Sequence, residues 1–143
     1  KDKNVNIFNS LGLQQRNKEF KLLAKELINR QIPETKEELL QLPGVGEYVA
    51  SAYLSLHQNK RSIIIDSNVV RLYGRFFGFD TDGETRRKKW FIELSEKLTP
   101  ERKFYLYNYG LLDLPRNICR IKPVCNFCPL MRKCKFYSYT KNQ

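Results

Sequence analysis

The stretch Leu42-Pro43-Gly44-Val45-Gly46 constrains the fold of this chain more than any other part of the sequence. Two glycines bracket one small apolar residue, and patterns typical of amphipathic helices lie on both sides. Such a turn aims successive backbone N–H groups in one direction, and the following helix adds its positive N-terminal end. The sequence therefore predicts a hairpin of two helices, at about residues 36–57, that binds a phosphate through Leu42, Gly44, Val45 and Gly46.

Helical spacing of apolar residues recurs along most of the chain. One predicted helix ends near Arg30, a short one is capped by Thr35 with Glu38 completing a capping box, and others fill 49–56, 69–77, 90–98 and 104–114. Gly78 is expected to end the helix before it. The apolar run 63–65 has no second strand pattern to pair with, so it predicts a buried extended segment. We therefore expect an all-α fold.

Asp66 lies at the end of that extended segment, twenty residues beyond Gly46. One interpretation is structural, because a carboxylate at this place caps the helix that begins at Ser67 and Asn68. The other is chemical, because a lone carboxylate beside a phosphate-binding turn is placed to act on a bound nucleotide. The two roles are compatible, since a cap would hold the carboxylate in one orientation.

The charge of the chain favours a polyanionic partner. Lys and Arg number 26 against 15 Asp and Glu, which gives a net charge of +11 and a pI near 9.6. No apolar run is long enough for a transmembrane helix, and no signal peptide is recognisable. We expect no membrane partner, no secretion, and a cytoplasmic location, associated with a prokaryotic nucleoid, or a nuclear one.

All four cysteines lie near the C-terminus in the pattern C-x5-C-x2-C-x5-C. Without a secretion signal, four clustered thiols favour a metal centre over a disulfide framework. Structural zinc sites usually combine two C-x2-C pairs, and only one such pair is present. Iron–sulfur clusters accept more varied spacing. The spacing alone leaves both metals open for Cys119, Cys125, Cys128 and Cys134.

The order of these motifs resembles the helix-hairpin-helix DNA glycosylases of the endonuclease III and MutY type. It runs from LPGVG through a helix rich in small residues to I-D-S-N-V-x-R at 65–71, Y-N-Y-G-L-L-D-L at 107–114, and the four cysteines. The resemblance covers residues 11–134. It implies the C-terminal part of that fold: a helical core at 1–118, an iron–sulfur loop at 119–134 and a tail at 135–143.

The same resemblance implies roles for single residues. The four cysteines would hold a [4Fe–4S] cluster, with zinc as the alternative, although the first cysteine spacing is one residue shorter than is usual in the family. Asp66 would be the catalytic carboxylate, which stabilises positive charge on the deoxyribose as the N-glycosidic bond breaks. Bifunctional members carry a lysine where this chain has Tyr48, so a monofunctional enzyme is expected. Asn68 and Arg71 would contact DNA, although Arg71 also fits a solvated helix face.

The resemblance is strongest to the mismatch glycosylases that remove thymine or uracil opposite guanine. The alternative is an adenine glycosylase acting opposite 8-oxoguanine or guanine, and a second alternative is a DNA-binding fragment without catalysis. The expected partner is double-stranded DNA with a mismatched or damaged base. Family members carry a further N-terminal part, so we also expect that a preceding segment or a second chain completes the fold.

Overall fold

The computed structural model describes residues 13–141, and all the regular structure in that range is helical. This confirms the all-α prediction for the described residues. The segment 63–65 is extended and unpaired, and Ile64 is buried within it, as expected. The α-helices are α1 (Gln14–Glu26), α2 (Lys36–Leu39), α3 (Glu47–Leu56), α4 (Ser67–Phe77), α5 (Lys89–Leu98), α6 (Phe104–Asn117) and α7 (Lys135–Lys141). Three 3-10 turns accompany them: η2 (Thr85–Arg87), η3 (Cys125–Phe127) and η4 (Met131–Lys133).

Two predicted helix boundaries are confirmed by their local hydrogen bonds. The Thr35 hydroxyl accepts a 3.4 Å hydrogen bond from the backbone N–H of Glu38 and donates one of 2.8 Å to the Glu38 carboxylate. Gly78 ends α4 in the left-handed region, with φ at 78°. Both signals are local in sequence, because each depends on residues within one helical turn.

Three boundaries differ from the prediction. α1 ends at Glu26 rather than near Arg30, because the chain turns away at Asn29, which has φ at 57°. α6 continues past Leu114 to Asn117 and keeps Pro115 buried inside it. The tail predicted at 135–143 contains a helix, α7, that packs against α4. In α6 and α7, packing against other elements extends the helical structure beyond what the weak sequence pattern predicts.

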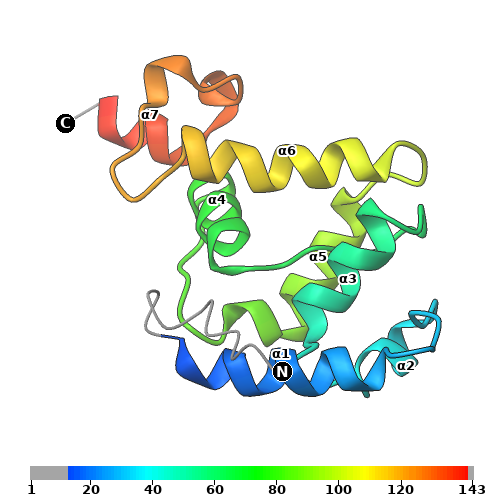
Figure 1. Ribbon diagram of the computed structural model, residues 1–143. Coiled ribbons are helices and arrows are strands. Elements are labelled where there is room, and N and C mark those ends of the chain that lie inside the picture. Colours follow the sequence, from blue (N-terminus) through cyan, green and yellow to red (C-terminus); the bar gives the residue numbers. More distant parts are fainter. Residues whose placement is uncertain (1–12, 142–143) are drawn as a thin grey trace.

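Two buried clusters organise the helices (Figure 1). The first lies under the hairpin and joins Leu39, Leu42, Ala50 and Leu54, with Leu23 of α1 and Leu27 at its C-cap packed against it. The second surrounds α4, and its buried members are Val69, Val70, Leu72, Tyr73, Phe91, Leu111 and Cys119. In Figure 1, α6 crosses one side of the molecule and α1 the opposite side, with α3, α4 and α5 between them.

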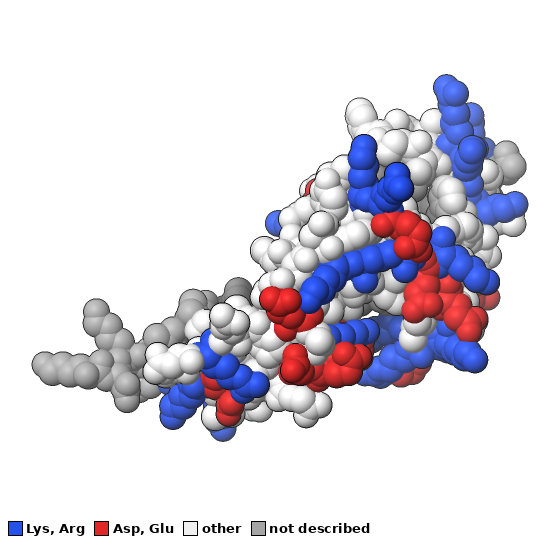
Figure 2. All heavy atoms as spheres, turned by 90° about the vertical axis from the view of Figure 1, so that its right-hand side faces the viewer, with Lys and Arg blue, Asp and Glu red and all other residues white. Residues whose placement is uncertain are grey.

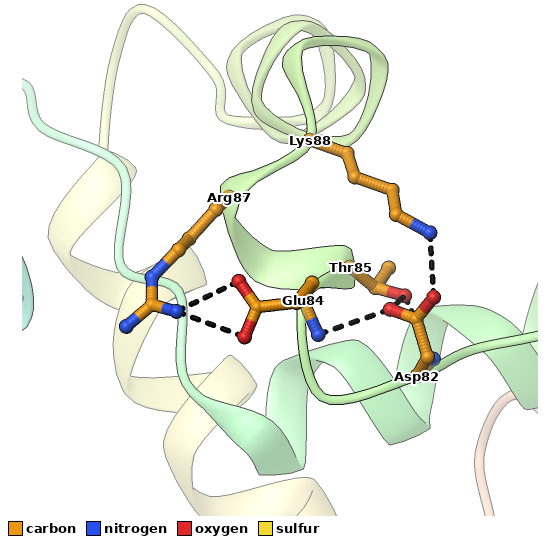
Figure 3. Close-up of polar contacts among 5 residues, drawn as sticks. All are labelled: Asp82, Glu84, Thr85, Arg87 and Lys88. Atoms are coloured by element: carbon orange, nitrogen blue, oxygen red, sulfur yellow. Dashed lines mark hydrogen bonds and ion pairs between the residues drawn. The ribbon is translucent and has the colours of Figure 1, made fainter.

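A hydrogen-bonded turn connects α4 to α5 (Figure 3). The Asp82 carboxylate accepts hydrogen bonds from the Thr85 hydroxyl at 2.8 Å and the Glu84 backbone N–H at 3.0 Å, and Lys88 contacts it at 2.6 Å. The Lys88 hydrogen bond, followed by that from Thr85, lowers the pKa of Asp82 from its ordinary value of 3.8 to about 2. Thr85 itself is fully buried, so the turn is anchored to the core.

Candidate active site

The glycine turn combines a left-handed backbone with an uncapped helix start, two features that favour phosphate binding. Gly44 has φ at 72°, and the Val45 N–H donates to the Leu42 carbonyl at 3.1 Å to close the turn. Gly46 then forms the N-cap of α3, and no side chain caps that helix end. A Cβ placed on Gly46 would meet nothing within 4 Å, so the turn is open on that side. The first backbone N–H groups of α3 are therefore available to an anion.

Gly44 also lies too close to α1 to accept a side chain. A Cβ at this position would lie 2.9 Å from the Cβ of Glu19 on α1. The left-handed backbone and this close contact each favour glycine, so the turn depends on Gly44 for two independent reasons.

Asp66 has the capping role that its position suggested, and its chemical role stays a prediction. It is the N-cap of α4, where its Oδ1 accepts a 2.8 Å hydrogen bond from the Val69 N–H. Its Oδ2 accepts a second hydrogen bond, also 2.8 Å, from the side-chain amide of Asn68. The residue is half-buried, so the carboxylate is held in one orientation while part of it stays accessible.

Tyr48 lies close enough to Asp66 for their electrostatics to be coupled. It is the second residue of α3 and is 40% exposed. Partial burial raises the pKa of the Tyr48 phenol above its ordinary value, and the negative charge of Asp66 raises it further. The phenol is therefore neutral at physiological pH and can donate a hydrogen bond, and α3 and α4 together place it beside the carboxylate.

The four cysteines line one small cavity between α4 and the C-terminal loop. All four are free thiols. Burial raises the pKa of the Cys125 thiol, and the charges of Cys119, Cys134 and Cys128 add to that shift, because the four sulfur atoms converge. Within residues 13–141, no three Cys, His, Asp or Glu side chains are arranged to bind one common metal ion.

Two arginines of α4 hold the cysteine loop. Arg71 donates from Nε to the Cys119 carbonyl at 3.0 Å and from Nη2 to the Pro115 carbonyl at 3.1 Å. Arg75 donates to the carbonyls of Arg120 at 2.7 Å and Ile121 at 3.0 Å. Its guanidinium also lies 3.6 Å from the Cys119 sulfur and 4.8 Å from the centre of the Phe136 ring. These contacts are intramolecular, so the guanidinium of Arg71 does not project freely from a solvated face.

Basic residues are unevenly distributed over the chain. On the face shown in Figure 2, acidic and basic side chains interleave. The segment 115–143 instead has no Asp or Glu, and it carries Arg116, Arg120, Lys122, Arg132, Lys133, Lys135 and Lys141. The cysteine loop and α7 are therefore the most consistently basic part of the sequence. None of the helices within residues 13–141 has the length and apolar character needed to cross a membrane.

Comparison with known proteins places these features in a family. Residues 27–54 match the model of the helix-hairpin-helix motif. The chain is 35% identical over 127 residues to the thymine/uracil-DNA glycosylase of Methanothermobacter thermautotrophicus, covering 86% of this chain and 58% of that protein. The solved structure of a thermostable thymine-DNA glycosylase aligns with a TM-score of 0.78 and 34% identity, over 90% of this chain and 61% of that one. The chain belongs to the helix-hairpin-helix DNA glycosylase superfamily.

Similarity within the superfamily extends to an enzyme named for a different base. The adenine DNA glycosylase of Buchnera aphidicola is 34% identical over 119 residues, covering 80% of this chain and 34% of that protein. The chain thus spans about three fifths of the thymine glycosylases it matches and one third of this adenine glycosylase. Superfamily membership is shared by both groups and does not choose between their substrates.

The structure brings most of the predicted site residues of this superfamily member together. Tyr48, Asp66 and Asn68 form one group beside the glycine turn, and the four cysteines form a second group at the far end of α4. The sequence offers no signal for the structural role of Arg71 and Arg75, because their partners lie 44 to 48 residues away. The DNA contact expected of Arg71 stays a prediction.

Proposed function

We propose that this chain carries the catalytic centre of a monofunctional DNA glycosylase that removes a mispaired pyrimidine. The observation that supports this most is the Asp66 carboxylate, fixed by two hydrogen bonds and placed beside Tyr48 at the start of α3. In this proposal the glycine turn binds the DNA backbone, and the Asp66 carboxylate acts on the nucleotide. Membership of a DNA glycosylase superfamily supports the same reaction class.

The hairpin would hold a phosphate through the turn at Leu42, Gly44, Val45 and Gly46. This fixes the strand while the mispaired nucleotide is extruded, which costs least at a mismatch because pairing there is already weak. As the N-glycosidic bond breaks, positive charge develops on the sugar, and the Asp66 carboxylate stabilises it. Water then adds to the sugar, which leaves an abasic site and the free base.

Tyr48 restricts the reaction to hydrolysis. A bifunctional glycosylase attacks the sugar with an amine and forms a Schiff base, whereas a phenol forms none. The raised pKa of Tyr48 keeps the phenol protonated at physiological pH, so it is suited to donate a hydrogen bond near Asp66. We therefore expect an abasic product without strand cleavage.

Thymine or uracil opposite guanine is the substrate that we favour. The relatives named thymine/uracil-DNA and thymine-DNA glycosylase support this choice, since the alignments cover 58% and 61% of their lengths. Adenine opposite 8-oxoguanine or guanine is the competing choice, because adenine glycosylases are nearly as similar in sequence. A chain that binds DNA without catalysis is the second alternative.

A duplex panel separates these three possibilities. The full-length protein is incubated with duplexes containing G·T, G·U, 8-oxoguanine·A and matched G·C, and released base is measured before and after alkali. We expect base release from G·T and G·U, with strand breaks only after alkali. Release of adenine alone would favour the competing substrate. Salt-sensitive binding without release from any duplex would favour the non-catalytic alternative.

We also propose that Cys119, Cys125, Cys128 and Cys134 bind a [4Fe–4S] cluster. The residues fit this group, because four free thiols line a single cavity and Arg75 lies 3.6 Å from one sulfur. When bound, the cluster would tie together the segment from the end of α6 to the start of α7, because its four ligands lie between Cys119 and Cys134. Zinc is the alternative, and iron, sulfide and zinc analysis of the purified protein distinguishes the two.

Double-stranded DNA is the proposed partner, in a cytoplasmic or nuclear location. The basic segment 115–143 is suited to lie along a phosphate backbone, because it carries no acidic side chain. We propose further that a segment or second chain beyond these residues supplies helices of the fold, since the chain covers 58% of its thymine/uracil relative. Fractionation of cells and mass measurement of the native protein test the location and the completing segment.

A further inference from the structure

Asn108 of α6 is fully buried, and its side chain joins two elements that lead to the candidate active site. Its Nδ2 donates a 2.7 Å hydrogen bond to the Ser55 hydroxyl near the end of α3. The same nitrogen donates one of 2.9 Å to the Ser62 carbonyl in the segment between α3 and α4. Its Oδ1 is buried and has no hydrogen-bond partner. An unsatisfied buried acceptor is unfavourable, so a position that retains one invites a functional explanation.

Each of the two elements bonded to Asn108 leads to a candidate active-site residue. α3 leads back to Tyr48, and the segment after Ser62 leads forward to Asp66. Tyr48 lies seven residues before Ser55 on α3, which is two helical turns and about 10 Å along the same face. Asp66 lies four residues after Ser62 in extended chain, which corresponds to about 13 Å. The paths are similar in length, and at their ends the Asp66 charge acts on the Tyr48 phenol.

The buried face of α3 supports this arrangement. Ser51 and Ser55 are nearly inaccessible, and they lie one and two turns beyond Tyr48 on the same side of the helix. That side therefore packs inward at Ser51 and Ser55, whereas Tyr48 at its start is 40% exposed. A change in the joint at Asn108 would tilt α3 relative to segment 62–66 and alter the distance between Tyr48 and Asp66.

We infer that Asn108 is a positioning residue, which sets the separation of Tyr48 and Asp66 by joining Ser55 of α3 to the Ser62 carbonyl. Its side-chain hydrogen bonds within residues 13–141 are to Ser55 and Ser62 and not to Tyr48 or Asp66. The effect of Asn108 on catalysis rests on the proposed function. Its effect on the separation of Tyr48 and Asp66 rests only on its two hydrogen bonds. A displacement of about 1 Å at a reacting group can slow a reaction on the order of 10²-fold, so a small change at the joint is enough to be measured.

The test uses Asn108→Leu and Ser55→Ala in the full-length protein. Leucine keeps the branched shape and the number of side-chain heavy atoms of asparagine but makes neither hydrogen bond, whereas Ser55→Ala removes one bond and disturbs packing little. We expect Asn108→Leu to lower the single-turnover rate of base release by roughly 10- to 100-fold, with DNA affinity changed less than about threefold. Ser55→Ala should act in the same direction by less, and the two changes should be non-additive because they act on one joint.

A second readout does not depend on catalysis. In protein labelled with 3-fluorotyrosine, the ¹⁹F resonance of Tyr48 is identified by its absence in Tyr48→Phe, and its pKa is measured by titration. In Asn108→Leu this pKa should fall toward the value found in Asp66→Asn, because Asp66 no longer lies as close. A protein without activity on any duplex would contradict the proposed function, yet this titration would still test the joint.

Thr85→Val is the matched control, because Thr85 is also fully buried and hydrogen-bonded but lies in the turn before α5. It should lower thermal stability while the Tyr48 pKa and the rate of base release stay at the parental values. The inference is overturned if Asn108→Leu and Ser55→Ala leave the Tyr48 pKa unchanged. Should Asn108→Leu fail to fold, Ser55→Ala decides alone by the same criterion.

Discussion

The two ends of α4 are fixed in different ways. At its N-terminus, Asp66 bonds to Asn68 and Val69, which are two and three residues away. Toward its C-terminus, Arg71 and Arg75 bond to carbonyls that lie 44 to 48 residues further along the chain. The first end is thus oriented by its own turn of helix, and the second by the folded C-terminal loop.

This difference indicates that the two ends of α4 have different roles. The N-terminal end presents a half-buried carboxylate to a ligand, and its orientation requires only local structure. The C-terminal end joins the cysteine loop and α7 to the core, because Arg75 reaches both the loop carbonyls and the Phe136 ring. Changes at the first end should therefore affect chemistry, and changes at the second should affect stability.

Arg75→Met should produce the largest change in stability. The substitution keeps most of the aliphatic volume but removes hydrogen bonds from a charged donor to two loop carbonyls. We expect the free energy of unfolding to fall by about 2 kcal/mol in urea denaturation. Arg87→Met is the control, because Arg87 pairs only with Glu84 on an exposed turn and should change stability by less than about 0.5 kcal/mol. Equal effects of the two variants would contradict the role given to Arg75.

Gly78→Ala should have a smaller effect at the same end of the helix. Alanine at φ 78° is strained, and its Cβ would lie 3.0 Å from the Cβ of Lys135 on α7. We expect a loss of about 1 to 2 kcal/mol by the same denaturation measurement. Gly83→Ala serves for comparison, since a Cβ there meets nothing within 4 Å. If Gly78→Ala is as stable as Gly83→Ala, the close packing of α7 on α4 is wrong.

Substitution of Asp82 should have the smallest effect on stability, and this effect should be visible only at acid pH. Its pKa is lowered from 3.8 to about 2 in the folded state, mainly by the Lys88 hydrogen bond. Its contribution to stability is therefore complete above pH 4 and is lost as the pH falls toward 2. Asp82→Asn should remove this part of the pH dependence when thermal unfolding is followed between pH 2 and pH 5. Because the Asp82–Lys88 pair is exposed, the change in stability should be small. Identical pH profiles of thermal unfolding for parent and variant would contradict this prediction.

The same contrast explains which features the sequence could predict. The caps at Thr35 and Asp66 and the stop at Gly78 were predictable, because each depends on residues within one helical turn. α7 and the continuation of α6 through Pro115 were missed, since packing against distant residues decides them. The roles of Arg71, Arg75 and Asn108 were missed for the same reason, as their partners are more than 40 residues away. Motif order predicted the superfamily, whereas periodicity predicted only helices.

The rate of base release by Asp66→Asn tests the central claim most directly. Asparagine still caps a helix, so α4 and the overall stability should be preserved within about 1 kcal/mol. It carries no charge, however, and offers less stabilisation to the positive sugar. On a G·T duplex under single-turnover conditions, we expect release to be slowed on the order of 10²- to 10³-fold, with DNA affinity retained. Release by the folded variant at the parental rate would contradict it.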